Sequence, residues 1–226
     1  MLTEQDQLFL KQHFPFWNKL SDAEQTLLTK HSFHRSYNKS SLIYNGSIEC
    51  LGVILVLNGI LRASLLSEDG KDITLYRLFQ GDVCILSASC LLNNITFDIS
   101  INVIEEAEII IIPYHYISSI IEQNTEIANF VQDITYHRFS DVMWTLEQIL
   151  FMSLDERLAA YLYDECLQTK SNVLHTTHAT IALNIGSARE AVSRMLKYFE
   201  DEGIIKLNRG EIEIIDRPLL FSYTHK

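Results

Sequence analysis

The sequence lacks the features that would place it in a membrane or on a disulfide scaffold. No apolar run reaches the ~18 residues that a membrane span needs, and the acidic start has no secretory pattern. Its cysteines are scattered, with no C-x-x-C pair, at Cys50, Cys84, Cys90 and Cys166. This spacing argues against a zinc ribbon and fits a reducing compartment, so we expect a cytoplasmic protein.

Motifs of enzymes are also missing. The sequence has no G-x-S-x-G, Walker loop, H-E-x-x-H or convincing Ser/His/Asp arrangement. No histidine occurs between Arg35 and Tyr114, so a metal-dependent cupin enzyme would have no ligand cluster there. We therefore expect no enzymatic activity, no metal and no cofactor.

A basic helix is the most informative segment that is present, at Ser187–Tyr198. Its first residues spell S-A-R-E, a capping-box sequence from Ser187 to Glu190. An apolar face follows at helical spacing, formed by Val192, Met195, Leu196 and Phe199. The opposite face is polar and carries Arg189, Glu190, Ser193, Arg194 and Lys197.

The flanking segments complete a recognisable unit. A first helix is predicted from a cap at Thr177 to Gly186, and strands at Gly203–Leu207 and Glu211–Ile215 predict a β-hairpin. Two short helices joined at a glycine and followed by a hairpin are typical of a winged helix-turn-helix, whose second helix enters the DNA major groove. The alternative is a winged helix that only contacts proteins.

The charge distribution bears on this choice. The net charge is −11, but residues 1–151 hold nine Lys+Arg against 18 Asp+Glu, whereas residues 152–226 hold nine against 11. The acidic excess therefore lies in the first part, and the local field at the basic helix decides its approach to DNA.

A β-rich region is predicted from about Leu42 to Ile112. Short apolar runs alternate with turns at Asn45–Gly46, Asn58–Gly59, Asp69–Gly70 and Gln80–Asp82. The runs 59–67 and 71–79 predict a hairpin, and the whole predicts a small sandwich or barrel. Residues 1–35 are predicted as short helices, one at Phe14–Trp17 and one after a capping box at Ser21–Glu24.

A long helix is predicted at Glu126–Phe151, after a short one at Tyr114–Glu122. Its apolar stripe, with polar interruptions, comprises Phe130, Val131, Ile134, Thr135, Arg138, Val142, Thr145, Leu146 and Ile149. One alternative is that the stripe packs on its own domain. We expect instead that it pairs with the same helix of a second chain as a coiled coil, with Val142 at the interface, since a palindromic DNA site suits a two-fold dimer. Phe151–Met152 is the expected hinge, and a capping box at Ser153–Glu156 is expected to begin the first helix of the last domain. The predicted domains are therefore the β-roll at 1–125, the long helix at 126–151 and the winged helix at 152–226.

Two motifs resemble the Crp/Fnr family of bacterial transcription regulators. The winged-helix motif, from Thr177 to Ile205, is T-H-x-x-I-A-x-x-x-G-S-x-R-E-x-V-S-R-x-L-K-x-F-E-x-x-G-I-I; it departs at Ala179 and Thr180, where the family usually has Gln and Glu. The run from Leu55 to Asp82 resembles the β-roll sensor of that family. The resemblance implies an α+β chain with an N-terminal β-roll (cyclic-nucleotide-binding-like), a long dimerisation helix and a C-terminal winged helix-turn-helix.

The same resemblance implies partners and DNA contacts. It implies a homodimer on palindromic double-stranded DNA, with RNA polymerase as a further partner and half-sites related to TGTGA or TTGAT. Arg189 and Arg194 would read guanines, Glu190 a cytosine or adenine, and Ser193 would support a base or phosphate. The predicted contacts are Thr177, Ser187, Arg189, Glu190, Ser193, Arg194, Lys197 and, in the wing, Arg209.

The sensor departs from the cyclic-nucleotide members of the family. Leu86 stands where their ribose-binding Glu is expected, and no Lys or Arg occurs from Leu78 to His137. A buried phosphate without a cation is costly, so cyclic AMP is not expected. An unidentified, mostly apolar effector is predicted between β-roll and long helix, at Cys84, Ser87, Ser89, Cys90, Val142, Met143, Trp144 and Leu146. Haem on His31, His34 or His137 and redox chemistry at Cys84 and Cys90 remain open alternatives.

Overall fold

The fold is taken from a computed structural model, which describes residues 2–45, 51–67, 72–85, 87, 99–121 and 123–225. The predicted turns at Gly46 and Asp69–Gly70, together with Leu86, Ser89 and Cys90, lie outside the described residues. The chain forms two compact units, Met1–Asp69 with Leu75–Val142 and Gly70–Thr74 with Met143–Lys226. Each unit is described by itself.

Short helices open the first unit: α1 (Glu4–His13), the 3-10 helix η1 (Trp17–Lys19) and α2 (Asp22–His31). The predicted capping box at Ser21 and Glu24 is confirmed. The helix predicted at Phe14–Trp17 is wrong, because Phe14 is the extended C-cap of α1. It precedes Pro15, whose ring disfavours helical backbone at the residue before it.

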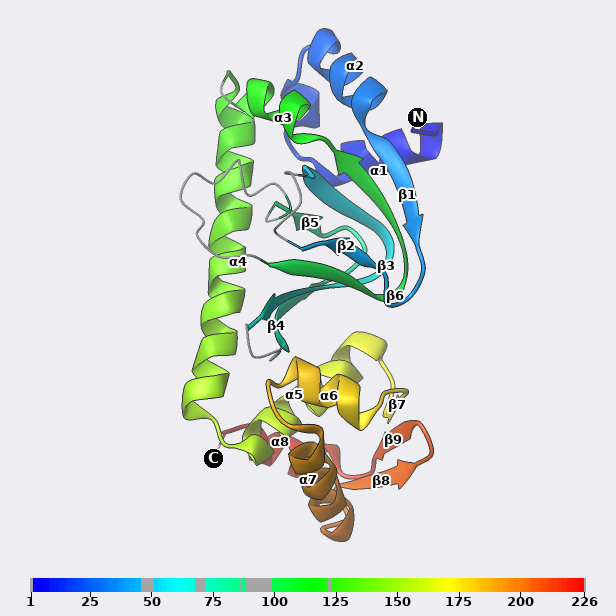
Figure 1. Ribbon diagram of the computed structural model, residues 1–226, viewed down its shortest axis with the longest axis vertical. Helices are drawn as coiled ribbons and strands as arrows, with labels where there is room; N and C mark the ends of the chain where they lie inside the picture. The colour runs from blue at the N-terminus through cyan, green and yellow to red at the C-terminus, as the bar shows by residue number, and fades with distance from the viewer. Residues whose placement is uncertain are drawn as a thin grey trace. The chain divides into compact units, whose positions relative to one another are not determined.

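An antiparallel sheet forms the body of the first unit (Figure 1). Its strands are β1 (Phe33–Tyr37), β2 (Leu42–Tyr44), β3 (Val53–Leu66), β4 (Asp72–Leu78), β5 (Val83–Cys84) and β6 (Ser100–Ile112). The order is β1-β6-β3-β4, with β2 also on β6 and β5 also on β3. The predicted β-rich domain is confirmed, with β3 and β4 as the neighbouring arms of the predicted hairpin.

The turn predicted at Asn58–Gly59 is wrong. The chain continues through it as one 14-residue strand, β3, whose pairing with β6 shifts register around Asn58 and Ile60. Gly59 has a φ of +86°, and a Cβ there would lie 2.2 Å from the Glu106 carbonyl oxygen. The glycine therefore serves a β-bulge where two backbones approach closely.

Strand β3 is buried on both faces and separates two apolar clusters. Val53 and Leu55 join a cluster with the N-terminal helices, whereas Ile54 and Val56 join a cluster inside the roll. Figure 1 shows α1, α2 and α3 (Tyr114–Ile121) gathered at one end of these strands. Burial on both faces explains why β3 reads as a continuous apolar run.

The long helix α4 (Thr125–Phe151) is confirmed at its predicted place. Phe130, Val131 and Ile134 pack against the cluster at the N-terminal helices, and Val142 packs against the cluster inside the roll. This half of the stripe therefore packs at least partly on its own unit, and the place of Val142 on a dimer seam stays a prediction. Among the described helices, none is long and apolar enough to cross a membrane.

The second unit is a small α+β domain built on one core. Its elements are α5 (Leu154–Thr169), β7 (Val173–Leu174), α6 (His178–Asn184), α7 (Arg189–Asp201), β8 (Ile205–Asn208), β9 (Glu211–Ile214), α8 (Arg217–Ser222) and η3 (Tyr223–His225). The sheet order is β7-β9-β8. The two predicted helices and the hairpin are confirmed, and the Ser153 N–H donates to Glu156 Oε2 at 2.6 Å at the predicted start of α5. The sequence patterns did not indicate β7 or α8.

Candidate nucleic-acid interface

The turn between α6 and α7 is fixed by backbone geometry. Thr177 caps α6, its Oγ1 accepting from the Thr180 N–H at 3.1 Å as predicted. Gly186 then adopts a φ of +61°, and the Ser187 N–H donates to the Ala182 carbonyl at 2.9 Å. This is the hydrogen bond of a Schellman motif, and it needs glycine's freedom at the left-handed position.

The capping box predicted at Ser187–Glu190 is wrong. Helix α7 begins at Arg189, its N-cap is Ala188, and no side chain caps it. Because the Ser187 N–H closes the preceding turn, this residue belongs to the turn and its hydroxyl is not at the cap position. Ser187 is half-buried there.

Helix α7 separates apolar and polar side chains cleanly. Val192, Leu196 and Phe199 are fully buried in the core of the second unit. Arg189, Glu190 and Arg194 are exposed on the other side. Within the described residues neither arginine has an ion-pair partner. The apolar face therefore anchors the helix while two free guanidinium groups face outward.

Ser193 is tied to the first helix of the pair. Its Oγ lies 2.7 Å from His178 Nδ1, so a hydrogen bond joins α6 to α7. The winged-helix motif includes His178, but sequence reasoning assigned it no role. Periodicity within one helix cannot show a contact between two helices, so only the packing of α6 on α7 reveals this residue.

Lys197 differs from the two arginines. Its Nζ lies 2.9 Å from Glu200 Oε2 and 3.1 Å from Asp201 Oδ1, and these contacts raise the pKa of Lys197. Glu200 also accepts from the Leu207 N–H in β8 at 2.9 Å, so the carboxylate is held in place. The charge of Lys197 is thus neutralised within its own domain.

A groove joins the start of both helices to the wing. It encloses about 280 Å³, and among the residues that line it are Thr177, His178, Arg189, Asn208 and Gly210. The exposed Arg209 sits beside it on the two-residue loop between β8 and β9. The structure thus gathers Thr177, Arg189 and the wing loop at one place, while Ser187 lies outside the groove.

The predicted effector residues divide into buried and exposed ones. Cys84 is fully buried in the cluster against which Val142 packs. Ser87 is also buried, and its Oγ donates to the Gly52 carbonyl at 2.6 Å. By contrast, Met143, Trp144 and Leu146 are exposed, between 44% and 51%. Of the predicted effector residues that the structure describes, Cys84 and Val142 are the two that belong to or pack against the same buried cluster.

A partly buried arginine lies immediately after the arginine-free window of the sequence. Arg138 Nη1 is 2.8 Å from Asp141 Oδ2, its Nη2 is 3.6 Å from Asp82 Oδ1, and its guanidinium lies over the Tyr76 ring. Burial, and next the neighbouring Cys84, raise the pKa of Tyr76 well above its usual value. The segment without Lys or Arg thus ends one residue before a cation that lies near this cluster. The carboxylates of Asp82 and Asp141 already neutralise the charge of Arg138.

The histidines considered for haem have other neighbours. His34 Nδ1 is 3.0 Å from Asp6 Oδ1, and the His31 ring stacks on Tyr116 at a centroid distance of 4.0 Å. His137 is exposed on α4. In the part of the chain that the structure describes, no three His, Cys, Asp or Glu side chains group as metal ligands.

Comparison with known proteins agrees with this architecture. A family model described as the Crp-like helix-turn-helix domain matches residues 156–223. The chain is 23% identical over 207 residues to the cyclic AMP receptor protein of Thermus thermophilus, covering 91% of this chain and 94% of that protein. Structurally it resembles FixK2 of Bradyrhizobium japonicum, at a TM-score of 0.71 and 17% identity, covering 86% and 98%.

A solved structure with higher identity gives the assignment. It is a putative transcriptional regulator of the Crp/Fnr family from Eubacterium rectale, 40% identical, with a TM-score of 0.90, covering 96% of this chain and 100% of that one. Together with the helix-turn-helix match, this similarity shows that the chain belongs to the Crp/Fnr family of transcriptional regulators.

Proposed function

We propose that this regulator binds a specific palindromic DNA site through the exposed face of α7. The observation that carries the proposal is the pair of unpaired arginines, Arg189 and Arg194, on a helix whose opposite face is buried. Arginine donates in a fork that fits guanine O6 and N7, and a glutamate such as Glu190 accepts from cytosine N4. Ser193 supports a base or phosphate contact.

Phosphate contacts come from the flanks of this face. Thr177 and Arg189 border the groove next to the wing, and Arg209 offers a further cation there. Lys197 contributes less than expected, because Glu200 and Asp201 already pair with its ammonium group. Ser187 acts by shaping the turn.

The active form is a dimer of this chain, paired along α4. Tyr136, Phe139, Met143, Leu146 and Leu150 follow spacings of 3, 4, 3 and 4 residues, and each is exposed, between 44% and 64%. Such spacing is that of the a and d positions of a coiled coil, so the occupant that fits this face is a second copy of the same helix. A two-fold dimer also matches a palindromic site.

An effector acts on the first unit, and cyclic AMP is not that effector. Cys84 and Tyr76 belong to the buried apolar cluster against which Val142 packs, so an effector that acts on this part of the unit is expected to be mostly apolar. Arg138 is the cation nearest to this cluster along α4, and Asp82 and Asp141 already balance it. A regulator of this kind would act on RNA polymerase.

The test selects binding sites from random double-stranded DNA with the full-length chain and then measures affinities. Arg194→Ala should weaken binding to the selected site by about 1–3 kcal/mol and relax the preference at one base pair. Lys197→Ala is the matched control on the same helix, and it should leave the preference unchanged. Arg209→Ala should weaken all sequences alike and reduce the salt slope by about 1.

Equal affinity of Arg194→Ala and the unmodified chain for the selected site would overturn the assignment of the reading face. Failure to enrich any palindrome would favour a winged helix that contacts proteins only.

A further inference from the structure

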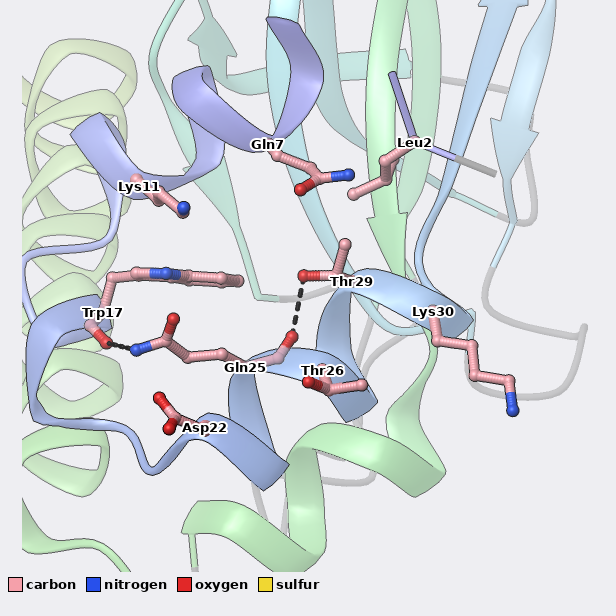
Figure 2. A pocket seen from close by; sticks show the side chains of 9 residues that line it. All are labelled: Leu2, Gln7, Lys11, Trp17, Asp22, Gln25, Thr26, Thr29 and Lys30. Atoms are coloured by element: carbon pink, nitrogen blue, oxygen red, sulfur yellow. Dashed lines mark hydrogen bonds between the residues drawn. The ribbon is translucent and has the colours of Figure 1, made fainter. Parts of the chain in front are cut away.

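The pocket between α1 and α2 is lined by groups that the fold already uses. It encloses about 590 Å³, and Gln25 and Thr29 in its wall donate hydrogen bonds to backbone carbonyl oxygens (Figure 2). Trp17 is only 2% exposed, so its ring belongs to the core behind the wall. A side chain of the second unit, Arg157, bears more directly on function.

The reading helix α7 begins without a side-chain cap of its own. Within the described segment 123–225, its N-cap is Ala188 and no side chain bonds to its first N–H groups. A cap normally fixes the first turn of a helix, so here the position of Arg189 depends on the turn that precedes it. That turn runs from Ile185 to Ala188, and the Ser187 N–H closes it onto α6.

A side chain from α5 holds this turn from outside the motif. Arg157 Nη1, in the first turn of α5, donates to the carbonyl oxygen of Ile185 at 2.9 Å. Ile185 is the C-cap of α6, and a cation is favourable at the end of a helix, where carbonyl groups lack partners within the helix. One turn further along α5, the Tyr161 hydroxyl lies 3.4 Å from Asn184 Nδ2. The end of α6 is thus attached to one face of α5, and Arg157 makes the shorter, charged bond.

The guanidinium group of Arg157 is held there at a cost in free energy. Burial lowers the pKa of Arg157, and its Nε is buried with no hydrogen-bond partner in the described part of the chain. A partly buried charge that is incompletely paired is a weak source of stability, and an apolar side chain can often replace it without loss. What an apolar side chain could not replace is the directional bond to the Ile185 carbonyl.

We propose that Arg157 is a positioning residue for DNA reading, because it holds the turn before α7 and thereby the first residue of that helix. The inference rests on the proposed function of α7. Arg189 comes four residues after Ile185, whereas Arg194 lies five residues further along the helix, about 7.5 Å at the helical rise. The fully buried Val192 anchors the helix between the two arginines. Displacement of the turn should therefore move Arg189 more than Arg194.

The experiment compares the base preferences of full-length variants on the selected DNA site. Arg189→Ala identifies the base pair that Arg189 reads, and Arg194→Ala identifies the one that Arg194 reads. Arg157→Ala should relax the preference at the first base pair and largely keep it at the second. Its affinity for the selected site should fall roughly tenfold, the factor that a hydrogen bond to a charged group commonly contributes.

Two further variants separate positioning from loss of charge. Arg157→Lys keeps a cationic donor and should recover part of the preference at the first base pair. Lys170→Asn removes the same charge from the exposed end of α5, and asparagine accepts the left-handed backbone there, so both preferences should stay unchanged. All variants are assayed well below their melting temperatures, and Arg157→Gln replaces the alanine variant if that one does not fold.

Equal relaxation at both base pairs, or a loss that Arg157→Lys does not reduce, would show general destabilisation and overturn the proposal. Unchanged preferences in Arg157→Ala would overturn it as well. If Arg189→Ala changes no base preference, the proposed reading of DNA fails and this inference falls with it. A change in Arg189→Ala without one in Arg157→Ala refutes the role of Arg157 alone.

Discussion

At the scale of single residues, His178 is the side chain that joins the two helices of the reading motif. Its Nδ1 lies 2.7 Å from Ser193 Oγ, and the ring also lines the groove beside Arg189. A serine hydroxyl can rotate freely, so a fixed partner decides which way its proton and lone pairs point. His178 is therefore a positioning residue for Ser193.

Replacement of this histidine should weaken specific DNA binding. His178→Ala removes one hydrogen bond, which corresponds to about 0.5–1.5 kcal/mol or roughly two- to twelvefold in affinity. Binding of the selected site, followed by fluorescence anisotropy, measures the change. If His178 acts through Ser193, the His178→Ala, Ser193→Ala double variant should lose no more than the larger single loss. Additive losses would show that the two side chains act independently.

Asp6 couples the first helix to the sheet through charge. Its carboxylate accepts from the Thr3 N–H at 2.8 Å and lies 3.0 Å from His34 Nδ1 in β1. Burial opposes ionisation of Asp6, but the hydrogen bonds from Thr3 and the contact with His34 outweigh it, so the pKa of this carboxyl lies below its usual value. The ionised form is thus the one that stabilises the fold.

The sign of the pH dependence follows from that lowered pKa. Stability from Asp6 is present above the unfolded pKa of about 3.9 and is lost as the pH falls through the lower folded value. Asp6→Asn should therefore lower the unfolding free energy by about 1–2 kcal/mol at neutral pH, with the difference shrinking below about pH 4. Urea unfolding at several pH values measures it. Glu4→Gln, an exposed carboxyl in the same helical turn, should have a smaller effect; a pH-independent difference for Asp6→Asn would contradict the assignment.

At the scale of elements, the sequence predicted most helices and strands because local chemistry fixes their ends. Capping residues at Ser21, Ser153 and Thr177 start helices where they were expected. The exceptions arise where tertiary contacts compete. The Ser187 N–H is used by the preceding turn, and Gly59 permits a bulge against β6 instead of a turn. Both contacts involve residues outside the local sequence pattern, so the pattern of a single segment cannot predict them.

Helix α4 shows why its partners could not be predicted from periodicity. It carries apolar residues on more than one face, and a helical repeat does not say which face meets its own sheet. The face with Ile134 and Val142 packs internally, whereas the heptad from Tyr136 to Leu150 stays exposed. Burial distinguishes the two faces and leaves the exposed one available for the dimer proposed above.

A charge on the exposed heptad should separate the dimer without unfolding the chain. Met143→Asp places an unpaired charge in the centre of the proposed seam, and breaking such burial costs about 3–5 kcal/mol. Sedimentation should then show a monomer, and operator binding should fall sharply. Trp144→Asp is the matched control, because Trp144 is exposed but off the heptad, and it should remain dimeric. Val142→Asp should instead lower the melting temperature, since Val142 packs on the sheet; a dimer unchanged by Met143→Asp would rule out this seam.

At the scale of the whole molecule, the family could be predicted from the sequence, but the balance of charges on the proposed reading face could not. Arg189 and Arg194 were recognised by their spacing, and both are exposed in the structure. The neutralisation of Lys197 depends on Glu200 and Asp201 in the same helix, and the partly buried Arg138 lies 3.6 Å from Asp82, which comes from another part of the chain. Such ion pairs decide which cations remain available to bind a phosphate. They form only in the folded chain, so the sequence pattern does not reveal them.

The same pairings bear on the response of the whole protein to cyclic AMP. A ligand that binds only the folded state stabilises it by about 2.7 kcal/mol at a hundred times its Kd. Binding with a Kd of about 10 μM would therefore raise the melting temperature by roughly 5–10 °C at about 1 mM. We expect no shift, because Asp82 and Asp141 already pair with Arg138 and would repel a phosphate. Selected operator DNA is the positive control and should raise the melting temperature under the same conditions. A shift of several degrees with cyclic AMP, or tighter operator binding in its presence, would show that the sensor uses a cyclic nucleotide after all.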